Sequence, residues 1–290
     1  MRQKFIEKVL YPALVRYHGS RELKILRELR RSERLSADKL HHLRLHRLRG
    51  ILKHAADYVP FYRRRFAEVG FAPEDLRDFN DLKGIPILTK ADIQSHHDEM
   101  ISTYYRRDQL VENRTGGSTG SPLFFYHNRE RLDSRQAATL RHNSWAGYRV
   151  GCKAAIIWGH QQDISLFTST KARLRRRLID RTLFLDAASL SEKTLSDFVR
   201  RLDSFRPEII LTYANSLAPV IDFCVERGLR LHSPRAIITS AEVLTDENRR
   251  KIEGFFDAKV FDRYGCREVS IIASECEAHD GLHINAENLY

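Results

Sequence analysis

Hydrophobic and polar residues follow two different periods along this chain, and the change comes near Asn113. From Arg21 to Ala56, leucines and isoleucines recur at steps of three and four residues among Arg, Lys and Glu. This is the period of an amphipathic helix with a charged outer face. Further on, Thr89 is followed three residues later by Asp92, a spacing that predicts a helix N-terminus. Residues 1–110 are therefore predicted to form a helical N-terminal region.

After Asn113, short apolar runs alternate with helical patterns. The apolar runs predict strands at 123–126, 153–158, 208–212, 235–239 and 259–262. The segments between them predict helices at 129–148, 191–202, 216–227 and 246–255. Alternation of this kind is typical of an α/β domain whose sheet is mainly parallel and flanked by helices. We therefore expect residues 111–290 to form an α/β part that follows the helical region.

The charge of the chain suits an anionic partner. Its 290 residues include 49 Lys and Arg against 38 Asp and Glu, which leaves a formal net charge of +11. The run KARLRRRLIDR at 171–181 would place Arg173, Arg176 and Arg177 on one helical face, with Leu174 and Leu178 on another. Nucleic acid or an anionic membrane surface would fit such a run. A solvated amphipathic helix is the interpretation that we favour, and nucleic acid is not the expected partner.

Cysteine usage and hydropathy indicate a cytoplasmic protein. The four cysteines, Cys152, Cys224, Cys266 and Cys276, form no close pair, and the first residues do not resemble a secretory signal. A transmembrane helix needs about 20 consecutive apolar residues, and no apolar run in the sequence is nearly that long. Residues 1–19 alternate charged and apolar positions, and we expect them to dock as a helix on their own domain rather than on a membrane.

The stretch NRTGGSTGSPLFFY at 113–126 concentrates glycines and hydroxyls before an apolar run. Glycines let the backbone approach an anion, and amides with Ser and Thr hydroxyls supply donors. The stretch matches neither the Walker pattern, since residue 121 is Ser where Lys is required, nor GxGxxG spacing. Pro122 and the apolar run favour a loop that leads into a strand. By itself the stretch predicts either a phosphate-binding loop or an ordinary hairpin turn.

Two later motifs follow this loop in a fixed order: Ser240-Ala241-Glu242, then Tyr264-Gly265-Cys266-Arg267-Glu268. The three motifs together resemble the adenylate-forming superfamily, and within it the phenylacetate–CoA ligase family, especially its capsular polysaccharide biosynthesis branch. The segments ECEAHDGLHIN, RPEIILTYANSL and NSWAGYRVGCKAAIIWG also resemble that family, so that the likeness covers roughly residues 40–290. It implies the N-terminal domain of an adenylate-forming enzyme, with its small C-terminal lid domain absent from this chain.

The resemblance also implies roles for individual residues. The loop would bind the ATP phosphates through Thr115, Gly116, Gly117, Ser118, Thr119 and Gly120. Ser240, Ala241, Glu242 and Tyr264 would contact adenine, and Tyr264 offers a flat ring for stacking. Gly265 and Arg267 would also belong to the nucleotide-binding residues. Glu268 would bind Mg²⁺, for which a carboxylate oxygen is a suitable ligand. We assign Thr119 and Glu268 as the catalytic residues.

The chain departs from the superfamily pattern at two places. Arg267 stands where a Thr or Ser often precedes the motif glutamate, and it could still meet an anion. The chain stops at Tyr290, whereas related proteins continue to a ribose-binding aspartate and a lysine-bearing mobile domain. Cys276 and His283 leave two interpretations open: half of a zinc site that later cysteines would complete, or a buried Cys and a hydrogen-bonded His. We favour the second of these.

The resemblance implies the N-terminal portion of an AMP-forming ligase, an incomplete fragment whose parent enzyme would activate a small carboxylate with ATP and Mg²⁺ and pass the acyl group to a thiol, coenzyme A above all. The acyl pocket is expected around Trp145, Trp158 and Tyr213. A homodimer is also compatible with the sequence. The acid itself is not specified by the family name. The first alternative is a non-catalytic nucleotide-binding remnant. A second alternative, which we favour less, is a basic protein that binds nucleic acid or an anionic membrane.

Overall fold

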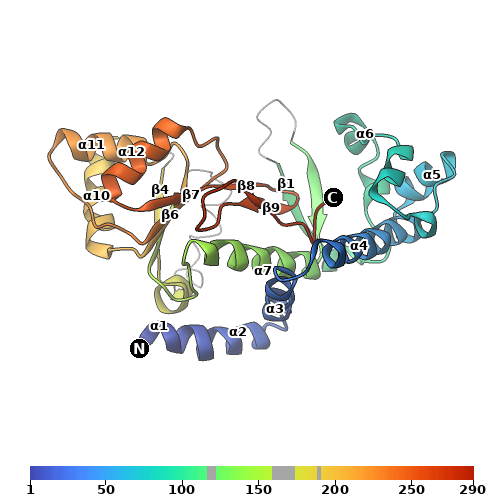
Figure 1. The fold of residues 1–290 in the computed structure, drawn as a ribbon, viewed down its shortest axis with the longest axis horizontal. Helices are drawn as coiled ribbons and strands as arrows, with labels where there is room; N and C mark the ends of the chain where they lie inside the picture. The colour runs from blue at the N-terminus through green and yellow to red at the C-terminus, as the bar shows by residue number, and fades with distance from the viewer. Residues whose placement is uncertain (116–121, 159–173, 188–190) are drawn as a thin grey trace. The chain divides into compact units, whose positions relative to one another are not determined.

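The computed structural model describes residues 1–115, 122–158, 174–187 and 191–290, and these divide into two compact units (Figure 1). The first, here called the sheet unit, comprises Met1–Leu23, Ala138–Cys266 and Ile271–Ile284. The second, here called the helical unit, comprises Lys24–Ala137, Arg267–Ser270 and Asn285–Tyr290. Each unit has its own buried apolar core.

The sheet unit is built on a parallel sheet of five strands in the order β4-β3-β5-β6-β7. Its strands are β3 (Ala154–Trp158), β4 (Thr182–Asp186), β5 (Ile209–Tyr213), β6 (Ala236–Ser240) and β7 (Lys259–Phe261). Four of them lie where the apolar runs predict strands, which confirms the α/β class with a parallel sheet flanked by helices. The edge strand β4 was not predicted, and it pairs with β3 from Ala154↔Thr182 to Trp158↔Asp186.

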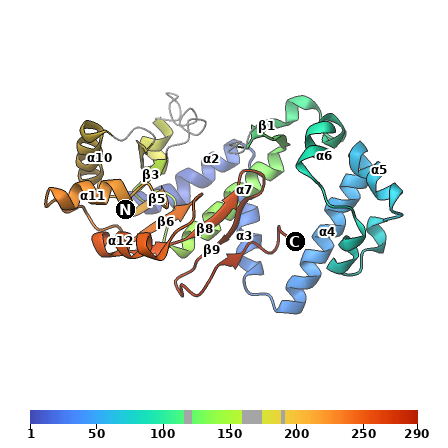
Figure 2. The ribbon, with the colours of Figure 1, turned by 90° about the horizontal axis from the view of Figure 1, so that it is seen from above.

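Alternate residues of these strands belong to two separate apolar cores, because successive side chains point to opposite faces of a sheet. On one face Ile210, Ile237 and Val260 pack against helices α10 (Glu192–Phe205), α11 (Ala218–Glu226) and α12 (Asp246–Phe256). Figure 2 shows these three helices beside the sheet. On the other face Ile209, Ile238 and Phe261 pack with Ala146 and Cys152. Burial on both faces explains why the strand sequences are continuous apolar runs.

The N-terminal helices dock on the sheet unit, as expected for residues 1–19. They are α1 (Arg2–Phe5), the π-helix η1 (Ile6–Leu10) and α2 (Tyr11–Tyr17), and Ile6, Tyr11 and Val15 are buried. Gly151 has a φ of +79°, and a Cβ added there would lie 2.9 Å from the Ile6 side chain. A glycine is needed at 151 because the backbone is left-handed there and the docked helix leaves no room.

Two further elements complete the sheet unit. An antiparallel sheet has the order β10-β9-β8, with β8 at Arg263–Cys266, β9 at Ser270–Ser274 and β10 at His283–Ile284. The short π-helix η6 (Arg176–Asp180) precedes β4. It carries part of the basic run at 171–181, whose residues Arg173 and Arg177 lie outside the part described at side-chain level. Among the described helices, none is long and apolar enough to cross a membrane.

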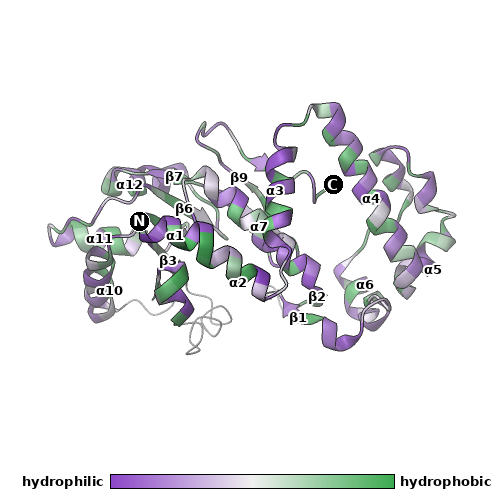
Figure 3. Cartoon of the chain, turned by 90° about the horizontal axis from the view of Figure 1, so that it is seen from below, coloured by the Kyte–Doolittle hydropathy of each residue, from purple (hydrophilic) through white to green (hydrophobic). Residues whose placement is uncertain are grey.

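The helical unit contains α3 (Glu22–Ser32), α4 (Ala37–Tyr58), α5 (Pro60–Glu68) and α6 (Lys90–Ser95), with four short 3-10 turns. These turns are η2 (Pro73–Asp75), η3 (Phe79–Gly84), η4 (Asp98–Met100) and η5 (Arg107–Gln109). Hydrophilic and hydrophobic residues alternate along α3 and α4 in Figure 3. The periodic segment 21–56 is therefore helical, but it forms two helices, α3 and α4, although its leucine period is continuous.

Local signals are confirmed at two places in this unit. The Thr89 hydroxyl accepts a hydrogen bond from Asp92 N at 3.1 Å, and the Asp92 carboxylate accepts one from Thr89 N at 2.8 Å. This reciprocal pair caps α6 as the spacing predicts. The strands β1 (Val111–Arg114) and β2 (Phe124–His127) form an antiparallel hairpin, so the glycine-rich stretch does lead into a strand. Helix α7 (Arg129–Trp145) follows the hairpin.

Candidate nucleotide site

The predicted adenine-binding residues Ser240–Glu242 lie at the carboxyl end of β6, an interior strand of the parallel sheet. Ser240 is the last residue of the strand, and it pairs with Tyr213, the last residue of β5. Ligands of open α/β sheets bind at the carboxyl ends of the strands. The sequence motif therefore lies at the edge of the sheet where a ligand is expected.

The turn after β6 is fixed by backbone geometry and by hydrogen bonds. Ala241 has a φ of +69°, a left-handed conformation that is uncommon for a residue with a Cβ. The Glu242 carboxylate accepts a hydrogen bond from Asn215 N at 2.9 Å, and the Asn215 side chain accepts one from Asn248 at 2.7 Å. These contacts tie the turn to the loop after β5 and to α12. Such strain at a tight, well-supported turn is common at ligand sites.

A direct contact joins this turn to the second adenine motif. Arg263 Nε donates to Ser240 Oγ at 3.4 Å, and its guanidinium also donates to the Asn143 side chain at 3.0 Å. The next residue, Tyr264, exposes 59% of its surface. An aromatic ring exposed to this extent is accessible for a base to stack on. The two motifs, more than 20 residues apart in sequence, are thus neighbours within the sheet unit.

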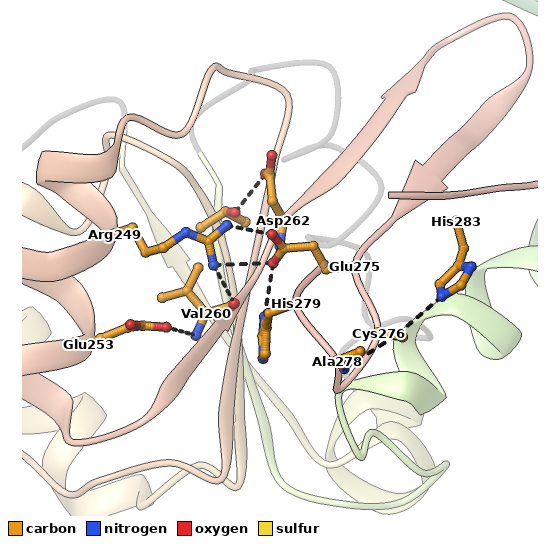
Figure 4. A network of polar contacts seen from close by, with 10 residues as sticks. Arg249, Glu253, Val260, Asp262, Glu275, Cys276, Ala278, His279 and His283 are labelled. Atoms are coloured by element: carbon orange, nitrogen blue, oxygen red, sulfur yellow. Dashed lines mark hydrogen bonds and ion pairs between the residues drawn. The ribbon is translucent and has the colours of Figure 1, made fainter. Parts of the chain in front are cut away.

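A polar network behind these motifs holds their strands together (Figure 4). The Glu275 carboxylate accepts two hydrogen bonds from Arg249, at 2.7 and 3.2 Å, and one from Asp262 N at 2.9 Å. The Asp262 carboxylate in turn accepts a hydrogen bond from Thr239 Oγ1 at 2.9 Å. Thr239 precedes Ser240 and Asp262 precedes Arg263. The network therefore positions both motif segments from the protein interior.

The predicted residues Thr115, Arg267 and Glu268 belong to the helical unit. Thr115 closes the β1–β2 hairpin: its N–H donates to Leu123 O, and its hydroxyl accepts from Leu123 N, both at 3.0 Å. The phosphate-loop residues Gly116, Gly117, Ser118, Thr119 and Gly120 lie outside the described residues. Their assignment to the phosphates stays a prediction.

Glu268, the predicted Mg²⁺ ligand, lies in a segment held by its backbone. Its carbonyl oxygen lies 3.4 Å from His127 Nε2 and accepts a hydrogen bond from Arg131 at 3.4 Å. The Glu268 residue itself is exposed. Burial, together with the nearby charge of Arg131, lowers the pKa of His127, so its ring stays uncharged beside the Arg131 guanidinium.

The expected acyl-pocket residues are only partly brought together. The rings of Trp158 and Tyr213, at the carboxyl ends of β3 and β5, lie 4.2 Å apart between centroids. Trp145 instead contacts the rings of His142 at 4.4 Å and His283 at 5.4 Å. The Trp158–Tyr213 pair, at the carboxyl ends of two neighbouring strands, is thus a better candidate than Trp145 for contact with an acyl group.

Cys276 and His283 do meet in the structure. His283 Nε2 lies 3.1 Å from Cys276 Sγ, and Ala278 N donates to the same sulfur at 3.4 Å. Cys276 is half-buried and His283 is exposed. Among the described residues, no three His, Cys, Asp or Glu side chains form a group that could hold a metal ion. A zinc half-site at this pair stays a prediction.

The network in Figure 4 was not foreseen from the sequence. Arg249 and Glu275 are 26 residues apart and belong to different elements, and no local pattern links them. The four-residue spacing of Glu275 and His279, which contact at 3.3 Å, was the one sequence signal available. No sequence signal points to Asn215 or Asn143, because each residue contributes through a contact with a residue that is distant in sequence.

Comparison with solved structures shows the class of fold. A crystal structure of 2-hydroxyisobutyryl-CoA ligase in the postadenylation state, in complex with R3-HIB-AMP, superposes with a TM-score of 0.68 at 20% identity. The match covers 86% of this chain and 53% of that one. The same ligase in complex with 2-HIB-AMP and CoA gives a TM-score of 0.68 at 21% identity, over 86% and 54%. The chain therefore has the fold of the adenylate-forming CoA ligases.

Sequence comparison finds relatives of the same kind. Phenylacetate-coenzyme A ligase of Pseudomonas putida is 30% identical over 264 residues, which are 89% of this chain and 58% of that protein. The enzyme of that name from Escherichia coli (strain K12) is 27% identical over 267 residues, 89% of this chain and 59% of its own length. Protein CapK of Staphylococcus aureus is 25% identical over 189 residues, or 65% and 41% of the two chains.

Over 89% of its length the chain is thus similar to phenylacetate–CoA ligases, at 27–30% identity. It spans somewhat under 60% of the length of the phenylacetate-coenzyme A ligases described above. No family model matches the chain.

Proposed function

We propose that this chain binds ATP and Mg²⁺ and takes part in AMP-forming activation of a small carboxylate, with coenzyme A as the acceptor of the acyl group. The observation that carries the proposal is the hydrogen bond from Arg263 to Ser240, which makes the two adenine motifs neighbours. Similarity to acid–thiol ligases supports the reaction class. The same relatives favour an enzyme over a binding protein without turnover.

In the proposed site, adenine would lie on the exposed ring of Tyr264, beside the turn Ser240–Glu242. The interior network on Glu275 would hold both segments in place while the ligand binds. Rigid support of this kind matters because a site that is loose by about 1 Å loses much of its catalytic power. Thr115 to Gly120 would donate amide and hydroxyl hydrogen bonds to the phosphates, and Arg267 would add a charge near them.

Mg²⁺ fits the donor that the chain offers. Glu268 is an exposed carboxylate, and Mg²⁺ is usually bound by one or two carboxylates together with water and substrate phosphates. When bound there, the ion would neutralise phosphate charge. The chain's own part would be to hold the ion through Glu268 and to keep that segment fixed through the His127 and Arg131 contacts to its backbone.

The reaction would proceed in two steps. A carboxylate oxygen of the substrate attacks the α-phosphorus of ATP, and the bond to the bridging oxygen breaks, so that an acyl-adenylate forms and pyrophosphate leaves. The thiolate of the acceptor then attacks the acyl carbon, and AMP leaves with the bonding electron pair. Positioning and charge neutralisation supply most of the rate in the first step.

ATP–pyrophosphate exchange tests the proposal. The purified chain is incubated with ATP, Mg²⁺, labelled pyrophosphate and a panel of aryl and short aliphatic carboxylates, and ATP binding is measured in parallel by calorimetry. Carboxylate-dependent exchange would support the ligase. Nucleotide binding without exchange would favour the non-catalytic alternative. Failure to bind ATP, AMP or an acyl-adenylate analogue would refute the nucleotide site.

A further inference from the structure

A cavity lined by basic residues lies in the sheet unit, away from the proposed nucleotide site. It is a cavity of about 380 Å³, and it gathers residues from the N-terminal helix, η6, β4 and the end of α10. Its charged lining residues are Arg2, Lys153, Arg176, Arg181 and Arg201. Each of them carries a positive charge, and no carboxylate is among the described residues that line the cavity.

The position of the cavity separates it from the nucleotide site. Lys153 precedes β3 and Arg181 precedes β4, so both lie at the amino ends of the parallel strands. Ser240, by contrast, is at the carboxyl end of β6. Parallel strands present their two kinds of ends at opposite edges of the sheet, and an ATP molecule at one edge cannot neutralise charges at the other.

Two of the cations are held by backbone oxygens and not by acids. Lys153 Nζ donates to Phe205 O at 3.1 Å, and the Arg181 guanidinium donates to Gly151 O at 3.0 Å. A backbone carbonyl orients a cation without cancelling its charge. An ammonium has three donors and a guanidinium has five, so each of these groups keeps hydrogen-bonding capacity beyond the bond that anchors it.

Two of the five cations lie near carboxylates of neighbouring elements. Asp197 pairs with Arg201 at 4.0 Å as well as with Arg200, and Asp180, which pairs with Arg175 at 3.3 Å, also interacts with the charge of Arg176. Glu208 pairs with Arg235 at 3.2 Å, outside the cavity lining. Arg2, Lys153 and Arg181 form no ion pair with an acid among the described residues, and an anion from solution would relieve the repulsion between these cations.

The rest of the lining is mostly apolar and half-buried: Leu183, Phe184 and Phe205, with Thr182 beside them. The Lys153 ammonium lies 5.5 Å from the centroid of the Phe205 ring. Cavities of a few hundred Å³ that combine an apolar wall with a few polar groups are typical of small-ligand sites. The wall could hold the organic part of a ligand while the cations hold its anionic part.

We propose that this cavity binds a phosphate or diphosphate group attached to a small organic body. Phosphate oxygens accept charge-assisted hydrogen bonds from guanidinium and ammonium groups, which are shorter and stronger than neutral ones. The same chemistry occurs in soluble phosphorylated metabolites and in the headgroups of anionic lipids. The site does not depend on the nucleotide function proposed above.

The test compares two double variants that remove the same charge. Arg2→Gln with Arg201→Gln changes the cavity, and neither side chain anchors the backbone through the bonds described above. Lys4→Gln with Arg200→Gln is the control, because it removes two cations from the same two elements outside the cavity lining. Binding of inorganic pyrophosphate is measured by calorimetry for the unaltered chain and for both variants, and melting temperatures verify folding.

We expect the cavity variant to lose a pyrophosphate-binding event, or to weaken it about tenfold or more, while the control keeps it. Pyrophosphate bound at the nucleotide site would contribute equally to both variants and cannot create this difference. Should the double variant not fold, Arg2→Glu alone, compared with Lys4→Glu, makes the same test at the exposed start of the chain. Equal pyrophosphate binding in the cavity and control variants would overturn the proposal.

A second arm identifies the source of the phosphate. Flotation with vesicles of phosphatidylcholine containing phosphatidic acid is compared with flotation on pure phosphatidylcholine. Binding to the anionic vesicles that the cavity variant loses would assign the site to a lipid headgroup. Pyrophosphate binding without flotation would assign it to a soluble phosphorylated ligand. Flotation that is equal in both double variants, with no difference in pyrophosphate binding, would refute a phosphate site in this cavity.

Discussion

Arg249 and Glu275 form a two-point ion pair, with guanidinium-to-carboxylate distances of 2.7 and 3.2 Å, between α12 and the end of β9. The Glu275 side chain is 10% exposed. Because Glu275 also accepts the Asp262 N–H, this one carboxylate connects a helix to the strands that carry both adenine motifs. The relationship links the stability of the sheet unit to the geometry of the proposed site.

Replacing Glu275 with Gln should therefore affect both properties. Loss of the negative charge leaves the partly buried Arg249 guanidinium without its ionic partner, although its hydrogen bond to Val260 O remains, and this should cost about 3 kcal/mol of unfolding free energy. AMP affinity should fall as well, since the motif segments lose their support. Urea unfolding and calorimetry measure the two effects. Glu192→Gln, which breaks an exposed pair with Arg227, is the control, and equal losses in the two variants would contradict the interior role of Glu275.

Tyr264→Ala should weaken AMP binding about tenfold, because stacking of a base on an aromatic ring contributes about 1–3 kcal/mol. Tyr264→Phe should retain most of the affinity, since the ring remains. Stability should change little in either variant because Tyr264 is largely exposed. Tyr17→Ala, at a more exposed tyrosine, controls for loss of surface aromatic area. Unchanged AMP affinity in Tyr264→Ala would exclude stacking at this residue.

Glu268→Gln should reduce the Mg²⁺-dependent part of ATP binding more than the binding of AMP. The amide keeps the shape of the side chain but loses the charge that a hard cation requires. Calorimetry with Mg·ATP, with ATP in a chelator and with AMP separates the two parts. The exposed acid Glu277 provides the matched change Glu277→Gln, which should leave all three affinities unaltered. If Mg·ATP and AMP affinities fall equally, Glu268 is not the metal ligand.

Substitutions in the glycine-rich loop test its predicted contact with the phosphates. Gly117→Val with Gly120→Val should abolish ATP binding, because side chains at these positions would block the approach of the phosphates to the backbone. The melting temperature should stay close to that of the unaltered chain. Gly50→Val offers a control at a helical glycine whose Cβ would meet nothing within 4 Å. Unchanged ATP affinity in the loop variant would exclude the loop from the site.

His127 should make the protein less stable in mild acid. Burial lowers the pKa of His127 in the folded state, whereas the unfolded chain regains the ordinary value of about 6.5. The stability contribution of the neutral ring is thus complete above about pH 6.5, and it is lost as pH falls toward and through the folded pKa. His127→Gln should flatten this decline in urea unfolding between neutral pH and mild acid. His46→Gln, at an exposed histidine, is the control substitution.

The sequence by itself determined the class of fold, most of the elements and the order of the motifs. Strands β3, β5, β6 and β7 could be recognised because burial on both faces requires continuous apolar runs. The α6 cap could be recognised because both partners, Thr89 and Asp92, are local. The motif order indicated the resemblance to phenylacetate–CoA ligases for the same reason: each motif is a contiguous stretch that is recognised without knowing what it contacts.

Tertiary structure alone decided the features that depend on residues distant in sequence. The leucine period continues from α3 into α4, so it gave no sign that the helix breaks between Ser32 and Ala37. Strand β4 follows an arginine-rich run, and its strand conformation comes from pairing with β3.

The same reason applies to the functional features. The Arg263–Ser240 contact, the network on Glu275 and the cations from five separate chain positions around one cavity were all unforeseen. A local pattern specifies which element a residue joins, whereas side-chain partners and the sharing of one cavity are set only when the packed sheet brings distant segments together.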